Sequence, residues 1–513
     1  MRFPRSSGVL LHPTSLPGPY GSGDFGPAAY HFVDWLVVAG QKLWQILPLG
    51  PVGLGNSPYM SLSAFAGNPL LVDLSELEHK GWLKEVELGS AASFPKSRVD
   101  FGKIIAFRTK ILHHAAKTFV SHSSSGDKAD FESFQHLNAG WLEDYALFMS
   151  LKNRYDGKEW CEWDEDVAKR KPSALEKARE ELVEEVSFWK FTQWCFFRQW
   201  AALKKYANEK GVQIVGDIPI FTAFQSSDVW AHPELYSLDD HLRPTFVAGV
   251  PPDYFSATGQ RWGNPLYRWD VMERDGFAWW IGRIKNTLGL VDIVRIDHFR
   301  GFAAYWEIPA DEKTAVHGRW VDGPKEQLFD TVLLKLGKLP IIAEDLGLMT
   351  DDVIALRDRF SFPGMKVLQF AFAGDPKNPF LPHNYLPNVV VYSGTHDNDT
   401  TLGWFKSATE RERAFAKKYI GTDGKEIHWD LIRLASQSVA DMAIYPMQDV
   451  LGLGTEARMN LPGKALGNWE WRFDWKEVHP THAARLYELT ALYKRCSAER
   501  LELPAYPHGK KLP

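Results

Sequence analysis

The sequence is poor in cysteine, in long apolar runs and in net positive charge, and each shortage excludes a class of protein. Its 513 residues include 3 cysteines, Cys161, Cys195 and Cys496. They are far apart, odd in number and without metal-ligand spacing, so we expect a reducing compartment and neither a disulfide framework nor a zinc site. No apolar run approaches the ~20 residues of a membrane span. The apolar run at residues 9–11 is too short for a signal-peptide core, so we expect a cytoplasmic protein, or else a plastid protein without its transit peptide.

Charge and composition limit the possible partners. Lysine and arginine number 59 against 64 aspartate and glutamate, a formal net charge of -5. This balance supplies no basic field for nucleic acid or for an anionic membrane, and we expect neither as a partner. With 45% hydrophobic and 24% charged residues, the chain can form a packed core. Its length suits one large domain with insertions.

Aromatic residues are abundant, with 21 Trp, 17 Tyr and 31 Phe. Sugar-binding clefts use aromatic platforms because the C–H face of a sugar ring is apolar. Large cores also hold many aromatic side chains. Composition alone leaves both interpretations open.

Short apolar runs predict eight buried strands, and helical patterns fall between many of them. Strands that alternate with helices predict parallel βαβ units, and eight such units favour closure into a barrel. The sequence therefore predicts an α/β fold, a (β/α)8 TIM barrel with inserted, largely helical subdomains. The expected strands are residues 8–12, 42–48, 213–217, 291–297, 340–344, 366–370, 389–393 and 442–448, and the expected helices include 28–39, 351–359 and 410–419.

Uneven spacing between these strands predicts insertions within a single catalytic barrel of residues 1–513. The second and third strands are separated far beyond a normal connection, which predicts a mainly helical subdomain at about 60–200. Within it, residues 172–210 have the spacing of one or two amphipathic helices, and the serine-rich residues 121–127 are typical of a loop. A second insertion, at about 222–285, is rich in Pro, Gly, Asp and aromatics and is expected to form a substrate-cleft subdomain with a lid loop.

Three carboxylates, each at the end of a predicted strand, are the candidate catalytic residues. Ionisable groups at the C-terminal ends of parallel strands form the active site of a barrel. The first is Asp297. Arg295, two residues earlier on the same strand face, should favour its ionised form and lower its pKa, as a nucleophile requires. A structural Arg–Asp ion pair is the alternative, but a His, an Arg and a Gly follow at once in Asp297-His-Phe-Arg-Gly-Phe302.

The second and third carboxylates are Glu344 and Asp397. Glu344 follows an apolar strand, and desolvation by these apolar surroundings should raise the pKa of Glu344, as a general acid requires. We expect Asp345 or Thr350 to cap the next helix. The segment Ser393-Gly-Thr-His-Asp-Asn-Asp-Thr400 is dense in short polar groups that could bind sugar hydroxyls. It could also be an Asx-rich turn. A metal site formed by His396, Asp397 and Asp399 is a third interpretation, disfavoured because no second ligand cluster is recognisable.

Two loops with aromatic residues are candidate walls of a cleft. One runs from Gly249-Val-Pro-Pro-Asp-Tyr-Phe255 through Gln260-Arg-Trp-Gly-Asn264, and the other contains Ser57-Pro-Tyr59. Flat apolar rings suit sugar binding, but the same loops could equally be packing lids.

In these motifs the chain resembles the 4-α-glucanotransferases, or amylomaltases, of glycoside hydrolase family 77. The resemblance runs nearly end to end and keeps many long motifs in one order. They are His12-Pro-Thr-Ser-Leu16, Ser57-Pro-Tyr59, Gly216-Asp-Ile-Pro-Ile220, Gly249-Val-Pro-Pro-Asp-Tyr-Phe255, Gly263-Asn-Pro265, Arg295-Ile-Asp-His-Phe-Arg-Gly-Phe302, Ala343-Glu-Asp-Leu-Gly347, Gly394-Thr-His-Asp-Asn-Asp399 and Arg458-Met-Asn-Leu-Pro-Gly463.

The resemblance implies a role for each matching residue. Asp297 corresponds to the nucleophile, Glu344 to the acid/base and Asp397 to the transition-state stabiliser. Among the expected substrate-binding residues, Arg295 and His396 are partners of these carboxylates and Asp217 belongs to the donor sugar subsite. One departure is Phe101, where many relatives have a tyrosine in a remote glucan-binding groove, and it puts a second glucan site in doubt. The residues expected to contact glucan on the acceptor side and in the lid are Tyr59, Tyr254, Phe255, Gln260, Trp262 and Asn264.

The reaction that the resemblance implies moves a segment of a 1,4-α-D-glucan to the 4-hydroxyl of an acceptor glucan or of glucose. It is a retaining double displacement, for which the two catalytic carboxyl groups should lie ~5–5.5 Å apart. Expected partners are malto-oligosaccharides and α-1,4-glucans, with no metal or other cofactor, in a monomer or weak homodimer. The alternatives are an α-glucan hydrolase of amylase type and a catalytically inactive glucan-binding protein.

Overall fold

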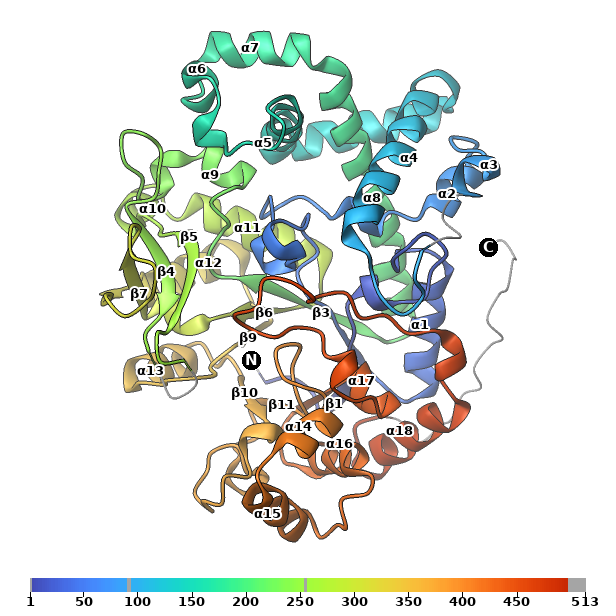
Figure 1. The fold of residues 1–513 in the computed structure, drawn as a ribbon, viewed down its shortest axis with the longest axis vertical. Helices are drawn as coiled ribbons and strands as arrows, with labels where there is room; N and C mark the ends of the chain where they lie inside the picture. The colour runs from blue at the N-terminus through green and yellow to red at the C-terminus, as the bar shows by residue number, and fades with distance from the viewer. Residues whose placement is uncertain (1, 90–93, 253–255, 497–513) are drawn as a thin grey trace.

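Eight parallel strands form a nearly closed barrel at the centre of the molecule (Figure 1). The structure is a computed structural model, which describes residues 2–89, 94–252 and 256–496. The strands neighbour one another in the order β10-β11-β12-β1-β2-β3-β6-β9. The two end strands are joined where Ala343 N donates to Pro363 O at 3.0 Å, just before β10. The strands are β1 (Ser6–Leu10), β2 (Leu43–Gln45), β3 (Gln213–Pro219), β6 (Ile293–Asp297), β9 (Ile341–Ala343), β10 (Gly364–Val367), β11 (Val389–Tyr392) and β12 (Met442–Pro446).

The predicted barrel is confirmed, and each of the eight expected strands overlaps one of these strands. Several expected strand ends were wrong, and two of them fall inside helices. Residues Leu368–Phe370 form a 3-10 helix, and Met447 begins the short helix α17 (Met447–Leu451). Leu368 and Met447, the first residues of these two helices, are apolar and buried like the strands before them, so hydrophobicity does not mark where the strands end.

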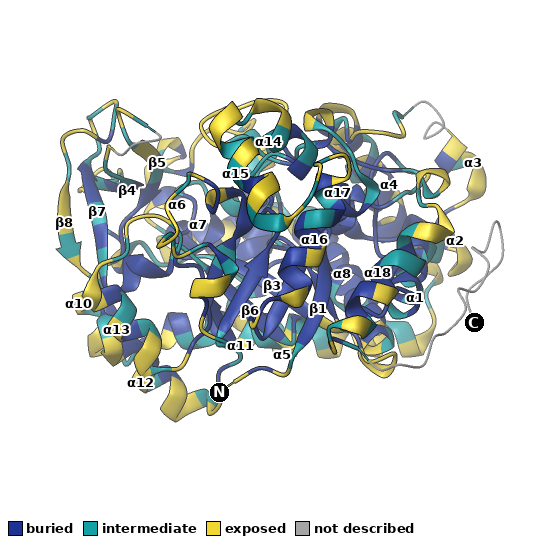
Figure 2. Cartoon of the chain, turned by 90° about the horizontal axis from the view of Figure 1, so that it is seen from below, coloured by how far each residue is buried: buried dark blue, intermediate teal, exposed yellow. Residues whose placement is uncertain are grey.

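The strands are buried from both sides, which explains their continuous apolar sequence. Figure 2 shows β1, β3 and β6 in the dark blue of buried residues, beneath helices whose outer faces are exposed. Gly8 allows β1 and β2 to pair, since a Cβ at that position would lie 2.3 Å from the Leu43 carbonyl oxygen. Helices on the outside of the barrel include α1 (Pro27–Val38), α11 (Ala278–Leu290), α12 (Lys325–Leu336), α13 (Asp351–Arg359), α14 (Thr401–Ser407), α15 (Glu410–Ile420), α16 (Ile427–Gln437) and α18 (Pro480–Leu492).

The expected helices 28–39, 351–359 and 410–419 are confirmed as α1, α13 and α15. Asp345 and Thr350 do not cap α13 through their side chains: Thr350 is the N-cap residue but its side chain makes no cap hydrogen bond. Asp345 instead pairs with Arg357 and accepts the Met365 N–H.

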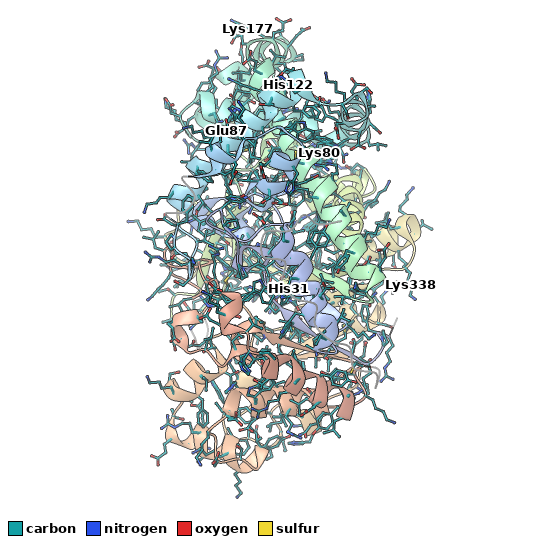
Figure 3. All side chains as sticks on the ribbon, turned by 90° about the vertical axis from the view of Figure 1, so that its right-hand side faces the viewer. His31, Lys80, Glu87, His122, Lys177 and Lys338 are labelled. Carbon is teal, nitrogen blue, oxygen red and sulfur yellow. The ribbon has the colours of Figure 1, made fainter. Side chains whose placement is uncertain are left out.

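Between β2 and β3 the chain is mainly helical, and most of these helices occupy the upper part of Figure 1. The expected amphipathic stretch is confirmed as two helices, α7 and α8, and Figure 3 shows Lys177 of α7 at the far end of the molecule from α14–α16. Whether this interval is a separate subdomain stays a prediction. The helices are α2 (Leu74–His79), α3 (Glu85–Leu88), α4 (Phe101–His122), α5 (Ser125–Arg154), α6 (Glu165–Ala168), α7 (Pro172–Glu181) and α8 (Val183–Glu209).

The expected loop at residues 121–127 was mostly wrong. Helix α4 continues to His122 and α5 begins at Ser125, so two residues separate the helices. The Ser124 hydroxyl accepts the Asp127 N–H at 3.1 Å, which makes Ser124 an N-cap. Among residues 2–89, 94–252 and 256–496, no helix is long and apolar enough to span a bilayer.

A second, antiparallel sheet lies beside the barrel, at the left of Figure 1, in the order β5-β4-β7-β8. Its strands are β4 (Phe246–Val250), β5 (Gln260–Pro265), β7 (Ala304–Pro309) and β8 (Arg319–Asp322). The expectation of a loop over residues 249–264 was therefore partly wrong, because β4 and β5 are the arms of a hairpin. The pairing that stabilises it comes from β7, distant in the chain, and local composition could not reveal it.

Candidate active site

Asp297, Glu344 and Asp397 all lie at the C-terminal ends of barrel strands. Asp297 ends β6, Glu344 directly follows β9, and Asp397 lies five residues beyond β11. The register pairs Ile296 with Ala343, so the residues after them, Asp297 and Glu344, follow adjacent strand ends. Because all eight strands run in the same direction, the three carboxylates belong to one rim of the barrel.

Arg295 connects two of the carboxylates. Its guanidinium contacts Asp297 Oδ1 at 3.0 Å and Asp217 Oδ2 at 2.5 Å. The second contact follows from the register, which pairs Arg295 of β6 with Asp217 of β3. Two carboxylates around one buried guanidinium give this cluster a net negative charge.

The expected lowering of the Asp297 pKa was wrong. Burial raises the pKa of Asp297 to about 6, although Arg295 opposes the shift, and the charges of Asp217 and Asp397 add to it. The Asp297 side chain retains 30% exposure. The sequence identified the ion pair, but the crowding of carboxylates comes from strands that are distant in the chain.

Glu344 is a buried carboxyl held by two backbone amides. Its Oε2 accepts the His298 N–H at 2.8 Å and its Oε1 accepts the Leu346 N–H at 2.7 Å. Burial, with the nearby charge of Asp297, raises the pKa of Glu344 to about 8. Since His298 directly follows Asp297, the Glu344 carboxyl lies against the backbone at the end of β6. Glu344 can therefore carry a proton beside a carboxylate that ionises more readily.

Asp397 is the most exposed of the three and is held from a different part of the chain. Its side chain is 47% exposed, and its Oδ1 accepts a hydrogen bond from Asn460 Nδ2 at 2.6 Å. Arg458 donates to the Asp397 carbonyl oxygen at 2.6 Å. His396 Nε2 lies 3.4 Å from Asp397 Oδ1. Asp397 is thus fixed from both sides, with half of its surface open to a ligand.

Tyr59 and His396 form an aromatic stack beside the carboxylates. Their rings are 5.0 Å apart and nearly parallel, and the Trp469 ring lies 5.8 Å from Tyr59. The Tyr59 hydroxyl donates to Asp217 Oδ2 at 2.8 Å. Tyr59 and Asp217 also line a small cavity of about 60 Å³. The structure therefore brings together Tyr59, Asp217, Arg295, Asp297 and His396.

The remaining expected glucan contacts lie mainly on β5. Trp262 packs edge-on against His298, with ring centroids 4.7 Å apart. Gln260 is exposed and accepts a hydrogen bond from the Trp262 indole at 3.1 Å. Asn264 is buried and donates to the Thr222 carbonyl oxygen at 2.9 Å, so its amide supports the fold locally. Tyr254 and Phe255 lie outside the described residues.

Sequence reasoning missed several supporting residues. Arg458 and Asn460 lie in a motif that was recognised, Arg458-Met-Asn-Leu-Pro-Gly463, but their contact with Asp397 depends on tertiary structure. Trp469 gave no sequence signal. Phe101 begins α4 with its side chain buried, so it contributes neither a hydroxyl nor an exposed ring there.

Within the described residues, the fold adds no further ligand to the metal site considered for His396, Asp397 and Asp399. His396 and Asp397 contact each other, whereas Asp399 Oδ2 accepts the Thr455 hydroxyl at 2.9 Å. In the part of the chain that the structure describes, no three or more His, Cys, Asp or Glu side chains are grouped so that they could hold a metal ion. What the rim offers is a protonated carboxyl beside an ionisable one, with a third carboxylate open to a ligand, which suits glycosidic bond chemistry.

Comparisons with known proteins agree with this chemistry. The family model described as 4-alpha-glucanotransferase, Glyco_hydro_77, matches residues 11–477. The 4-alpha-glucanotransferase of Thermus thermophilus is 54% identical over 503 residues, 96% of this chain and 100% of that protein. That of Synechocystis is 50% identical over 495 residues, 96% of this chain and 98% of that protein. The structure of an amylomaltase from Streptococcus agalactiae in complex with acarbose has a TM-score of 0.93 at 40% identity and covers 96% of this chain and 100% of that one.

Proposed function

Because the chain belongs to the 4-α-glucanotransferases of glycoside hydrolase family 77, we propose that it disproportionates α-1,4-glucans by a retaining double displacement. The donor is a malto-oligosaccharide or longer glucan, and the acceptor is the 4-hydroxyl of another glucan or of glucose. The observation that supports this mechanism best is the unequal pair: a buried Glu344 with its pKa raised to about 8 beside an Asp297 that ionises more readily.

In the first step Asp297 is the nucleophile. One of its carboxylate oxygens bonds to the anomeric carbon as the glycosidic bond breaks, and Glu344 gives its proton to the departing 4-oxygen. The product is a glucosyl ester of Asp297, and the released glucan ends in a new 4-hydroxyl. Arg295, at 3.0 Å from Asp297, limits the cost of ionising this carboxyl in a buried site.

In the second step Glu344, now ionised, is the base. It removes the proton of the acceptor 4-hydroxyl, whose oxygen attacks the anomeric carbon and displaces Asp297. Two inversions at one carbon retain the α configuration. Asp397, half exposed and fixed by Asn460, binds ring hydroxyls most strongly as the ring flattens, so it stabilises the transition state selectively.

The preference for a sugar acceptor over water requires an ordered acceptor and a protected intermediate. The β4–β5 hairpin is suited to this role, because Trp262 on its second arm packs against His298, the residue after the nucleophile. Shortening the hairpin at residues 251–259 should open this side and raise the share of hydrolysis. An unchanged transfer-to-hydrolysis ratio in the shortened protein would remove the hairpin from this account.

Incubation with maltotriose tests the proposed reaction. Transfer predicts glucose together with a ladder of chains longer than maltotriose, with the number of reducing ends unchanged. Hydrolysis of the amylase type would give only shorter products and new reducing ends. An inactive glucan-binding protein would leave maltotriose intact.

A further inference from the structure

A large cleft lies where the helical interval meets the barrel, separate from the catalytic rim. Its volume is about 680 Å³, against about 60 Å³ for the cavity at Tyr59 and Asp217. Helices α5, α8 and α11 and the short α9 (Ser227–Ala231) form its walls, together with residues 63 and 65. Figure 1 shows α5, α9 and α11 grouped in the upper half of the molecule. The volume falls in the range of small-molecule sites, ~300–1,000 Å³.

One wall of the cleft is a set of aromatic rings in mutual contact. Trp141 lies 6.4 Å from Phe65 with the rings nearly parallel, and 5.6 Å from Phe197. Trp279 packs edge-on against Phe65 at 5.9 Å. Phe65, Trp141 and Phe197 pack against the core but are only partly buried, and part of each ring borders the cleft. This arrangement offers flat apolar surface to a ligand.

The rest of the lining mixes apolar and polar residues, and its ionisable side chains are mostly acidic. Asp144, Asp228, Glu234 and Asp275 line the cleft, against a single lysine, Lys285. Two of these acids are already paired: Asp144 with Arg170 at 2.7 Å and Glu234 with His232 at 3.4 Å. Lys285 is the one lysine set against these acids in the lining, so the cleft does not favour an anionic ligand. A purely hydrophobic ligand would remove water from these charged groups, which costs free energy.

We propose that this cleft binds a neutral oligosaccharide. The aromatic wall suits the apolar C–H faces of sugar rings, and the carboxylates and amides suit their hydroxyl groups, which need acceptors and carry no charge. The choice of an α-1,4-glucan as the particular ligand rests on the proposed function, whereas the preference for a neutral sugar rests on the cleft itself.

The cleft shares a wall with the catalytic region. Ser63 and Phe65 line both this cleft and the small cavity at Tyr59. Two cleft residues fix that segment: Asp228 accepts the Ala64 N–H at 2.7 Å, and Asn286 donates to the Phe65 carbonyl oxygen at 3.2 Å. A long glucan bound here would be retained near the active site, which raises its effective concentration.

A pair of neighbouring alanines on α8 provides the test. Ala201 and Ala202 are both exposed, but Ala201 lines the cleft and Ala202 does not. Ala201→Trp should place a bulky ring in the cleft and obstruct it without removing any core contact, and Ala202→Trp is the matched control. Both changes are made in an Asp297→Asn background that prevents turnover, and each protein is titrated with maltotetraose by calorimetry. Trp141→Ala, which removes the central ring, is the second variant.

The proposal predicts two classes of maltotetraose site in the background protein and in the Ala202→Trp control. Ala201→Trp should lose one class, and Trp141→Ala should weaken that class at least tenfold. A single class in the background protein, or identical isotherms for the two tryptophan variants, would overturn the proposal. The parent enzyme is assayed separately with maltotriose: two classes of site in a protein without transfer products would contradict the proposed function and support the cleft.

Discussion

At the residue scale, the chemistry depends on how burial and nearby charges keep a proton on Glu344 while Asp297 ionises. Glu344 is enclosed and bonded to two backbone amides, whereas Asp297 retains 30% side-chain exposure and a guanidinium partner. Residue types and their positions after apolar strands were readable from the sequence, and they identified all three rim carboxylates. The balance between Arg295, Asp217 and Asp397 around Asp297 was not readable, because it is set by strands that pair across the barrel.

The unequal pair predicts a bell-shaped dependence of kcat/KM on pH. Activity should fall below about 6 as Asp297 gains a proton, and above about 8 as Glu344 loses one. The two limbs belong to the pair as a coupled unit. The leaving group of a maltosyl fluoride donor needs no protonation. With this donor the rate of the first step should therefore no longer fall at alkaline pH. An alkaline limb that persists with this donor in single-turnover measurements would contradict the acid role of Glu344.

Asn460 is predicted to act as a positioning residue for Asp397. Asn460→Ala removes the 2.6 Å hydrogen bond to Asp397 Oδ1 and frees the carboxylate to rotate. We expect kcat to fall about tenfold to a hundredfold with little change in KM, because a misplacement near 1 Å costs on that order.

Asn468→Ala is the control for this prediction. Asn468 accepts the Leu461 N–H and donates to the Lys464 carbonyl oxygen in the same segment, without touching Asp397. If both variants lose kcat equally, looseness of the segment explains the effect and the role of Asn460 is refuted.

At the element scale, the barrel was predictable because each strand is encoded by a local apolar run, while the second sheet was not. Residues 249–264 contain prolines and glycines that favour a loop, yet they include parts of the paired strands β4 and β5, and β4 also pairs with β7, which begins at Ala304. The turn between α4 and α5 shows the opposite error: Ser124 caps a helix where serine-rich composition suggested a flexible loop. Non-local pairing and specific capping both override composition.

Two glycines should respond in opposite directions to alanine. A Cβ at Gly8 would lie 2.3 Å from the Leu43 carbonyl oxygen, so Gly8→Ala should push β1 and β2 apart and cost about 3 kcal/mol. Gly140 lies in the middle of α5, and a Cβ added there would meet no neighbouring atom within 4 Å, so Gly140→Ala should stabilise by about 0.5–1 kcal/mol. Tm values taken at one scan rate check both signs. A Tm for Gly8→Ala at or above that of the parent would contradict the close packing of these strands.

At the scale of the whole molecule, the barrel collects residues that are hundreds of positions apart. Tyr59, Asp217, Asp297 and Asp397 come from four different strand ends or loops, and the segment at 458–460 closes around the last of them. No local pattern could supply these contacts. The family likeness supplied the proposed roles, and the fold brings the residues together because the C-terminal ends of parallel strands meet at one rim.

The central claim is that Asp297 forms a covalent bond with the sugar, while Glu344 donates a proton to the leaving oxygen and then removes one from the acceptor hydroxyl. Trapping tests it most directly: a Glu344→Gln variant is incubated with a fluorinated α-glucosyl fluoride, digested and examined by mass spectrometry. The account predicts that the peptide containing Asp297 gains one fluoroglucosyl group, and that an added Asp297→Asn change abolishes the label. A label on another carboxylate, or continued turnover of the fluoride by the Asp297→Asn protein, would contradict it.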